Sequence, residues 1–65
     1  MEVRIQEVRS EKNISLIRLS ELSGIPKSTL NDYENGKTSP TLVNLEILAR
    51  ALNVRISDLF DSIYK

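Results

Sequence analysis

The apolar residues of this chain recur at intervals of three and four, which is the spacing of one face of an α-helix. The first such stretch covers about residues 2–12 and places Ile5 and Val8 on its inward face. Asn13 is expected to end this helix, because asparagine tolerates a left-handed backbone. Along the whole chain the pattern predicts five helices and no strand, an all-α fold.

The second predicted helix is capped by Ser15 and places Leu19 and Leu22 on its inward face. A turn of only a few residues connects it to the next predicted helix. Gly24 can adopt the positive φ that closes a helix, and Pro26 suits the first position of the helix that follows.

The third predicted helix covers about residues 26–35, with Leu30 and Tyr33 inward and Gly36 as its C-terminal cap. Asn-Gly is also a hairpin signal, but neither flank alternates as strands would. A helix, a tight turn containing glycine and a second helix with polar residues outward form the layout of a DNA-reading helix-turn-helix.

The fourth predicted helix follows Pro40, is capped by Thr41 and ends at Asn53. Its apolar residues fall on two faces, so we expect it to be the central helix of the bundle. One face holds Leu42, Leu45, Leu48, Ala49 and Leu52, and the other holds Val43, Ile47 and Ala51.

The fifth predicted helix is capped by Ser57 and begins its apolar stripe at Leu59. The stripe continues almost to the end of the sequence, where a monomer would expose it. We therefore expect a symmetric homodimer whose interface contains Phe60, Ile63 and Tyr64.

The composition excludes several classes of function. The 65 residues suffice for one domain, expected to cover 1–65, and they include no cysteine and no histidine. Disulfides, zinc fingers, thiol nucleophiles and a histidine base are thereby excluded, and we expect no catalytic site, metal, cofactor or small-molecule substrate. No apolar run is long enough for a membrane span, so a cytoplasmic protein is expected.

The net charge is unusual for a nucleic-acid-binding protein. Nine Lys and Arg residues balance nine Asp and Glu residues, whereas such proteins usually have a basic excess. DNA binding would therefore depend on the positions of the charges. Several cations lie near the ends of the first three helices: Lys12, Arg18, Lys27 and Lys37.

The outward face of the third helix carries the residues expected to reach base edges, namely Lys27, Ser28, Asn31 and Asp32. Lysine suits guanine O6 and N7, asparagine suits adenine, and an aspartate can accept a hydrogen bond from cytosine N4. The alternative interpretation is an ordinary solvated polar face. Asp32 would also be repelled by phosphates and would act mainly against wrong sequences.

From about Ile5 to Phe60 the sequence resembles the Cro/repressor-type (XRE-like) helix-turn-helix family of bacterial and phage regulators. The resemblance rests on Arg9 and on three strings: LSELSGI (19–25), YENGKTSP (33–40) and LEILARALNVRISDLF (45–60). It implies a compact five-helix, lambda-repressor-like domain, usually dimeric, that inserts its third helix into the major groove of a palindromic operator.

Phosphate contacts are expected at the helix ends, where free N–H groups and the helix dipole favour anions. The family often has Gln at the start of the second helix, where this chain has Leu16; Ile17 also stands where the family is usually polar. The candidate phosphate ligands are Ser15, Arg18, Thr29, Asn35, Lys37 and Thr38.

The resemblance also implies an ion pair between Arg9, late in the first helix, and Glu34, at the end of the third. A bidentate pair would fix the angle of the recognition helix. The alternative is two independent surface charges.

Two functional classes follow. The preferred one is a sequence-specific regulator that binds double-stranded DNA as a homodimer and represses transcription. The alternative is an antitoxin-like or anti-repressor module that uses the same fold to bind a protein partner, as the neutral charge and an exposed Leu16 and Ile17 would favour.

Overall fold

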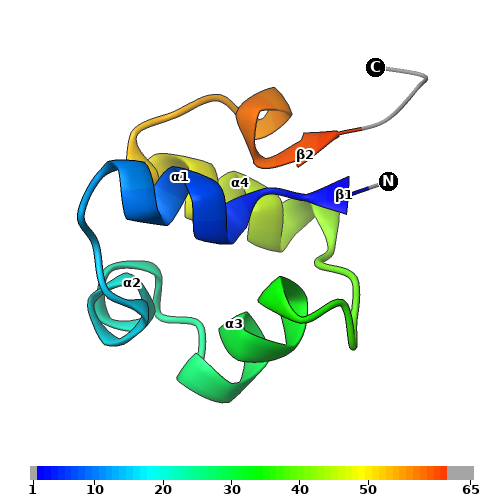
Figure 1. Cartoon of the computed structure of the whole chain (residues 1–65), viewed down its shortest axis with the longest axis horizontal. Coiled ribbons are helices and arrows are strands. Elements are labelled where there is room, and N and C mark those ends of the chain that lie inside the picture. Colours follow the sequence, from blue (N-terminus) through cyan, green and yellow to red (C-terminus); the bar gives the residue numbers. More distant parts are fainter. Residues whose placement is uncertain (1, 62–65) are drawn as a thin grey trace.

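The computed structural model describes residues 2–61, which form four α-helices, one turn of 3₁₀-helix and a pair of two-residue strands (Figure 1). The order is β1 (Glu2–Val3), α1 (Ile5–Glu11), α2 (Leu16–Ser23), α3 (Lys27–Glu34), α4 (Leu42–Leu52), η1 (Ile56–Leu59) and β2 (Phe60–Asp61). The all-α class predicted from the sequence is confirmed, with the short η1 in place of a fifth α-helix.

Helices α2 and α4 begin at the predicted caps. The Ser15 hydroxyl accepts a hydrogen bond from the backbone N–H of Arg18 at 3.0 Å, and the Thr41 hydroxyl accepts one from that of Asn44 at 3.1 Å. These bonds satisfy N–H groups that the first turn of a helix leaves without partners. Left-handed backbone follows the helices at Asn13, Gly24, Gly36 and Asn53.

A single apolar core joins the elements, with α4 packed against both α2 and η1. Its buried members are Ile5, Val8, Leu19, Ile25, Leu30, Tyr33, Leu45, Leu48, Ala49, Leu52 and Leu59. Three residues expected on inward faces are exposed instead: Leu22 (45%), Leu42 (70%) and Val43 (68%). Leu42 and Val43 occupy the first turn of α4, whereas the helix reaches the core only from Leu45 onward.

The first helix is shorter than predicted because the chain before it is extended. Val3 pairs with Phe60 in an antiparallel ladder, and the backbone N–H of Arg4 donates to the carbonyl of Leu59 at 2.7 Å. These bonds hold the first residues beside the C-terminal strand (Figure 1). The predicted helical start at residue 2 is therefore wrong, and α1 begins at Ile5.

The predicted fifth helix is a single 3₁₀ turn with a different cap. Arg55, not Ser57, precedes its first residue, and the Asp58 carboxylate accepts a hydrogen bond from the Arg55 backbone N–H at 3.1 Å. Phe60 is extended and partly buried against the core. Ile63 and Tyr64, the other predicted interface residues, lie outside the described residues.

Candidate nucleic-acid interface

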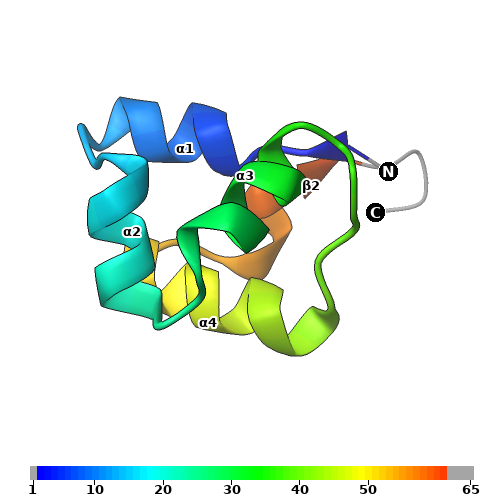
Figure 2. The same cartoon turned by 90° about the horizontal axis from the view of Figure 1, so that it is seen from below.

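The turn between α2 and α3 is fixed by side-chain and backbone hydrogen bonds. The Ser20 hydroxyl donates to the carbonyl of Ile25 at 2.7 Å, and the Ile25 N–H donates to the Ser23 hydroxyl at 3.2 Å. Gly24, at φ 77°, donates its N–H to the Ser20 carbonyl. With the Ile25 side chain buried in the core, this turn sets the angle between α2 and α3, which lie side by side (Figure 2).

Helix α3 is held to the rest of the molecule by its inward side chains. Leu30 is fully buried and Tyr33 nearly so. The side-chain amide of Asn44 on α4 donates to the Tyr33 hydroxyl at 2.8 Å, which satisfies a polar group at the edge of the core. Reasoning from the sequence did not single out Asn44, whose only signal is a polar residue in an apolar helix.

The ion pair between Arg9 and Glu34 implied by the resemblance is present. Arg9 Nε lies 2.9 Å from Glu34 Oε2 and Nη2 lies 3.2 Å from Oε1, a bidentate arrangement. Arg9 Nη1 also donates to the carbonyl of Ile14 at 3.1 Å. The side chains are only 16% and 7% exposed. One guanidinium thus connects α1, the α1–α2 loop and the end of α3.

The four residues predicted to read bases differ in exposure. Lys27, Ser28 and Asn31 are exposed, whereas Asp32 is half-buried. Pro26 immediately precedes the helix as its N-cap and is not its first residue. The exposed part of this face therefore extends from the first turn of α3 to Asn31.

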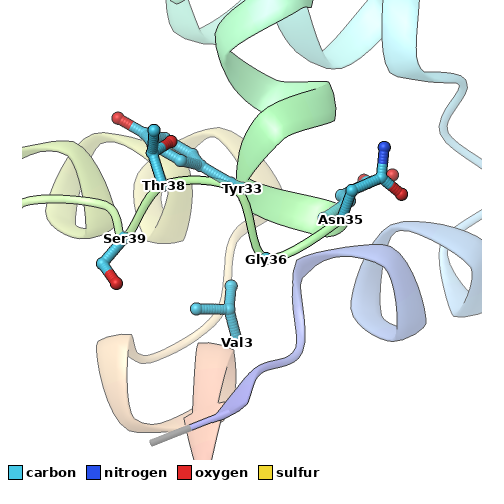
Figure 3. A pocket seen from close by; sticks show the side chains of 7 residues that line it. Val3, Tyr33, Asn35, Gly36, Thr38 and Ser39 are labelled. Carbon is cyan, nitrogen blue, oxygen red and sulfur yellow. The ribbon is translucent and has the colours of Figure 1, made fainter.

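The loop after α3 carries three of the predicted phosphate ligands, Asn35, Lys37 and Thr38, all exposed. Two backbone hydrogen bonds fix its start: Gly36 N–H to the Tyr33 carbonyl at 3.3 Å, and Lys37 N–H to the Asp32 carbonyl at 2.9 Å. This is the Schellman arrangement of a helix C-terminus. Beside the loop lies a hollow of about 320 Å³ (Figure 3).

The start of α2 differs from the expectation at one residue. Leu16 is half-buried and packs against the core, so it is not an exposed apolar contact, whereas Ile17 is 58% exposed. Ser15 uses its hydroxyl as the helix cap, and Arg18 forms a loose surface pair with Glu21 at 3.4 Å. Thr29, on α3, is half-buried.

The ion pairs show which cations are compensated by a neighbouring carboxylate. Four arginines are compensated by carboxylates, in the pairs Arg4–Glu7, Arg9–Glu34, Arg18–Glu21 and Arg50–Glu46. Lys27 and Lys37 form no ion pair with any residue that the structure describes. Uncompensated positive charge therefore lies at both ends of α3, although the whole chain is neutral.

A profile of the helix-turn-helix family matches residues 5–59, a range that contains α1 to η1 and hence both helices of the motif. The chain belongs to the helix-turn-helix family. The helix-turn-helix itself is formed by α2 and α3, as predicted. Among the described residues, no helix is long and apolar enough to cross a membrane.

Relatives of this helix-turn-helix chain are named as regulators. The chain is 33% identical over 54 residues to the immunity repressor protein of Bacillus phage phi105, covering 83% of this chain and 38% of that protein. It thus spans less than half the length of that relative.

Two solved structures superpose closely. The restriction-modification controller protein C.AhdI from Aeromonas hydrophila has a TM-score of 0.83 at 37% identity, covering 88% of this chain and 86% of that one. SinR, a master regulator of biofilm formation known from Bacillus subtilis, was solved in complex with DNA; its TM-score is 0.83 at 36% identity, covering 89% of this chain and 94% of that one.

Proposed function

We propose that this chain is a sequence-specific regulator of transcription that binds double-stranded DNA in the cytoplasm and represses by excluding polymerase from an operator. The observation that carries the proposal is a helix α3 with an exposed polar face, held at its start by the hydrogen-bonded turn and at its end by Tyr33 and Glu34. The uncompensated Lys27 begins this helix, and the uncompensated Lys37 lies in the loop after it. The DNA complex of SinR supports the choice of ligand.

In this proposal α3 enters the major groove of a palindromic operator. Lys27, Ser28 and Asn31 reach base edges from the exposed face of the helix. Asp32, being half-buried, acts mainly against sequences that place a phosphate or an acceptor beside it.

The phosphate contacts lie on both sides of α3. Predicted ligands are Ser15 and Arg18 on α2, Thr29 on α3, and Asn35, Lys37 and Thr38 in the loop. The first turn of α2 adds free N–H groups and the positive end of the helix dipole. Since Ser15 already accepts the bond from Arg18, its hydroxyl can still donate its proton to a phosphate oxygen.

Selection of bound sequences from a random pool of duplex DNA tests the proposal, followed by titration of salt against the selected site and a scrambled duplex. We expect the selection to enrich a palindrome. For both duplexes, the logarithm of the binding constant should fall linearly with the logarithm of the salt concentration, with a slope of about −0.9 per phosphate contacted. An unenriched pool with salt-independent binding contradicts the proposal.

We also propose a symmetric homodimer through Phe60, Ile63 and Tyr64, which would place the two copies of α3 about 34 Å apart, one turn of DNA. Ile63→Asp should convert a dimer into a monomer at micromolar concentration, because an unpaired carboxylate would have to be buried in an apolar interface. Sedimentation measures the masses, with Ser10→Asp on the exposed side of α1 as the matched control. Equal monomeric masses for all three proteins would exclude this interface in free solution.

A protein-interaction module is the second function that an observation supports. Ile17 and Leu22 are exposed apolar residues on α2, and exposed apolar side chains of this size are available for a protein contact. An antitoxin-like or anti-repressor role would use this surface to bind a protein partner. The same selection experiment separates the two functions, since only the DNA-binding regulator enriches a duplex.

A further inference from the structure

The sequence contains one asparagine followed by glycine, at Asn35-Gly36. Such a pair is chemically labile, because glycine has no Cβ to shield its backbone nitrogen from the neighbouring carboxamide. Of the other exposed asparagines, Asn13 and Asn53 precede the β-branched residues Ile14 and Val54, which crowd the same nitrogen. The chain therefore carries its own internal controls.

The structure leaves this pair open to reaction. Asn35 and Gly36 are both exposed, and no hydrogen bond to the Asn35 carboxamide occurs within the described part of the chain. Nothing lies within 4 Å of the position that a Cβ would take on Gly36. Figure 3 shows the Asn35 side chain on the far side of Gly36 from Thr38 and Ser39, at the end of α3.

We propose that Asn35 is a site of spontaneous deamidation, which adds a negative charge at the C-terminal end of α3. The Gly36 nitrogen loses its proton and attacks Asn35 Cγ. A bond between that nitrogen and Cγ forms, the bond from Cγ to the side-chain nitrogen breaks, and ammonia leaves with the proton. Water then opens the succinimide at either carbonyl, giving aspartate or isoaspartate with no redox change.

The C-terminal cap of α3 controls this reaction. Asn35 has ψ near 0°, and ring closure requires this angle to turn until the Gly36 nitrogen faces Cγ. That rotation breaks the bond from Gly36 N–H to the Tyr33 carbonyl, which at 3.3 Å is slightly longer than a typical N–H···O bond. A ligand that immobilises the loop would slow the reaction.

The product opposes DNA binding, a consequence that rests on the proposed function. A carboxylate at the C-terminus of α3 interacts unfavourably with the helix dipole and compensates the neighbouring Lys37. It also repels the DNA phosphate that the loop after α3 is proposed to contact. Isoaspartate further lengthens the main chain by one methylene between α3 and Lys37.

Peptide mapping by mass spectrometry tests the chemistry, on the 65-residue chain aged at 37 °C at neutral and mildly alkaline pH. We expect loss of the unmodified Asn35 peptide several-fold faster than of the Asn13 and Asn53 peptides. The loss should accelerate with pH, because the nucleophile is a deprotonated amide. Equal rates at the three asparagines would overturn the proposal.

A second measurement compares DNA affinity before and after ageing, for wild type and for Asn35→Gln, which keeps an amide but closes its ring slowly. The aged wild type should bind the selected duplex more weakly than its fresh sample, whereas aged Asn35→Gln should bind as its own fresh sample does. Duplex added during ageing should protect Asn35 from deamidation. If deamidated protein binds the duplex as tightly as fresh protein, the proposed effect of deamidation on DNA binding is overturned. Fresh protein that binds no duplex overturns the proposed function, whereas the mass data decide the chemistry separately.

Discussion

Replacing Arg9 by methionine is expected to lower the free energy of unfolding by about 3 kcal/mol, because it strands a nearly buried Glu34 carboxylate. The same change removes the donor to the Ile14 carbonyl, so the α1–α2 loop loses a contact as well. Urea denaturation followed by circular dichroism measures the effect. Glu34→Gln should be milder, because the amide oxygen can still accept a hydrogen bond from Arg9, which is the more exposed partner and keeps its bond to the Ile14 carbonyl.

The matched control is Arg50→Met, which breaks the surface pair with Glu46 and should change stability by less than about 0.5 kcal/mol. The double mutant Arg9→Met/Glu34→Gln should recover part of the loss, with a coupling energy of about 0.5 to 3 kcal/mol. Strict additivity of the two single changes would show that the pair contributes nothing beyond its separate members.

Features determined by local sequence could be predicted. Ser15 and Thr41 cap their helices, and Gly24 and Asn53 take the left-handed backbone expected of them, because each depends only on neighbouring residues. The buried positions of α1 and α3 likewise follow from periodicity. The pairing of Arg9 with Glu34 is not local, and only the family resemblance pointed to it.

Features determined by distant parts of the chain could not be predicted. Strands of two residues have no alternation to detect, and Val3 becomes extended only because Phe60 lies beside it. Periodicity also identifies an apolar face without showing how much of that face packs against other elements. Leu22 and Leu42 are therefore exposed, although their spacing suits the core.

The structure also limits which candidate residues can act as predicted. Lys27, Ser28 and Asn31 are exposed on one helix, as base readers must be, while Asp32 and Thr29 are half-buried. Asn44 and Ser20, which hold α3 in position, were absent from the prediction because their bonding partners were visible only after folding.

Lys27→Ala is expected to weaken binding to the selected duplex by about 1 to 3 kcal/mol and to relax the preference at one base pair, provided that the chain reads DNA as proposed. Lys27 is exposed in the first turn of α3 and has no ion-pair partner among residues 2–61. Its removal therefore deletes a base contact without disturbing the fold. Thermal unfolding verifies that stability is unchanged.

The matched change is Lys37→Ala, in the loop that follows α3, where the proposed contact is a phosphate. It should weaken binding to the selected and scrambled duplexes about equally and reduce the magnitude of the salt slope by about 1, because one counterion fewer is released. Titrations of both variants against both duplexes separate base reading from phosphate anchoring. If the two lysines affected the two duplexes alike, Lys27 would be a phosphate contact, and sequence readout would have to come from Ser28 and Asn31.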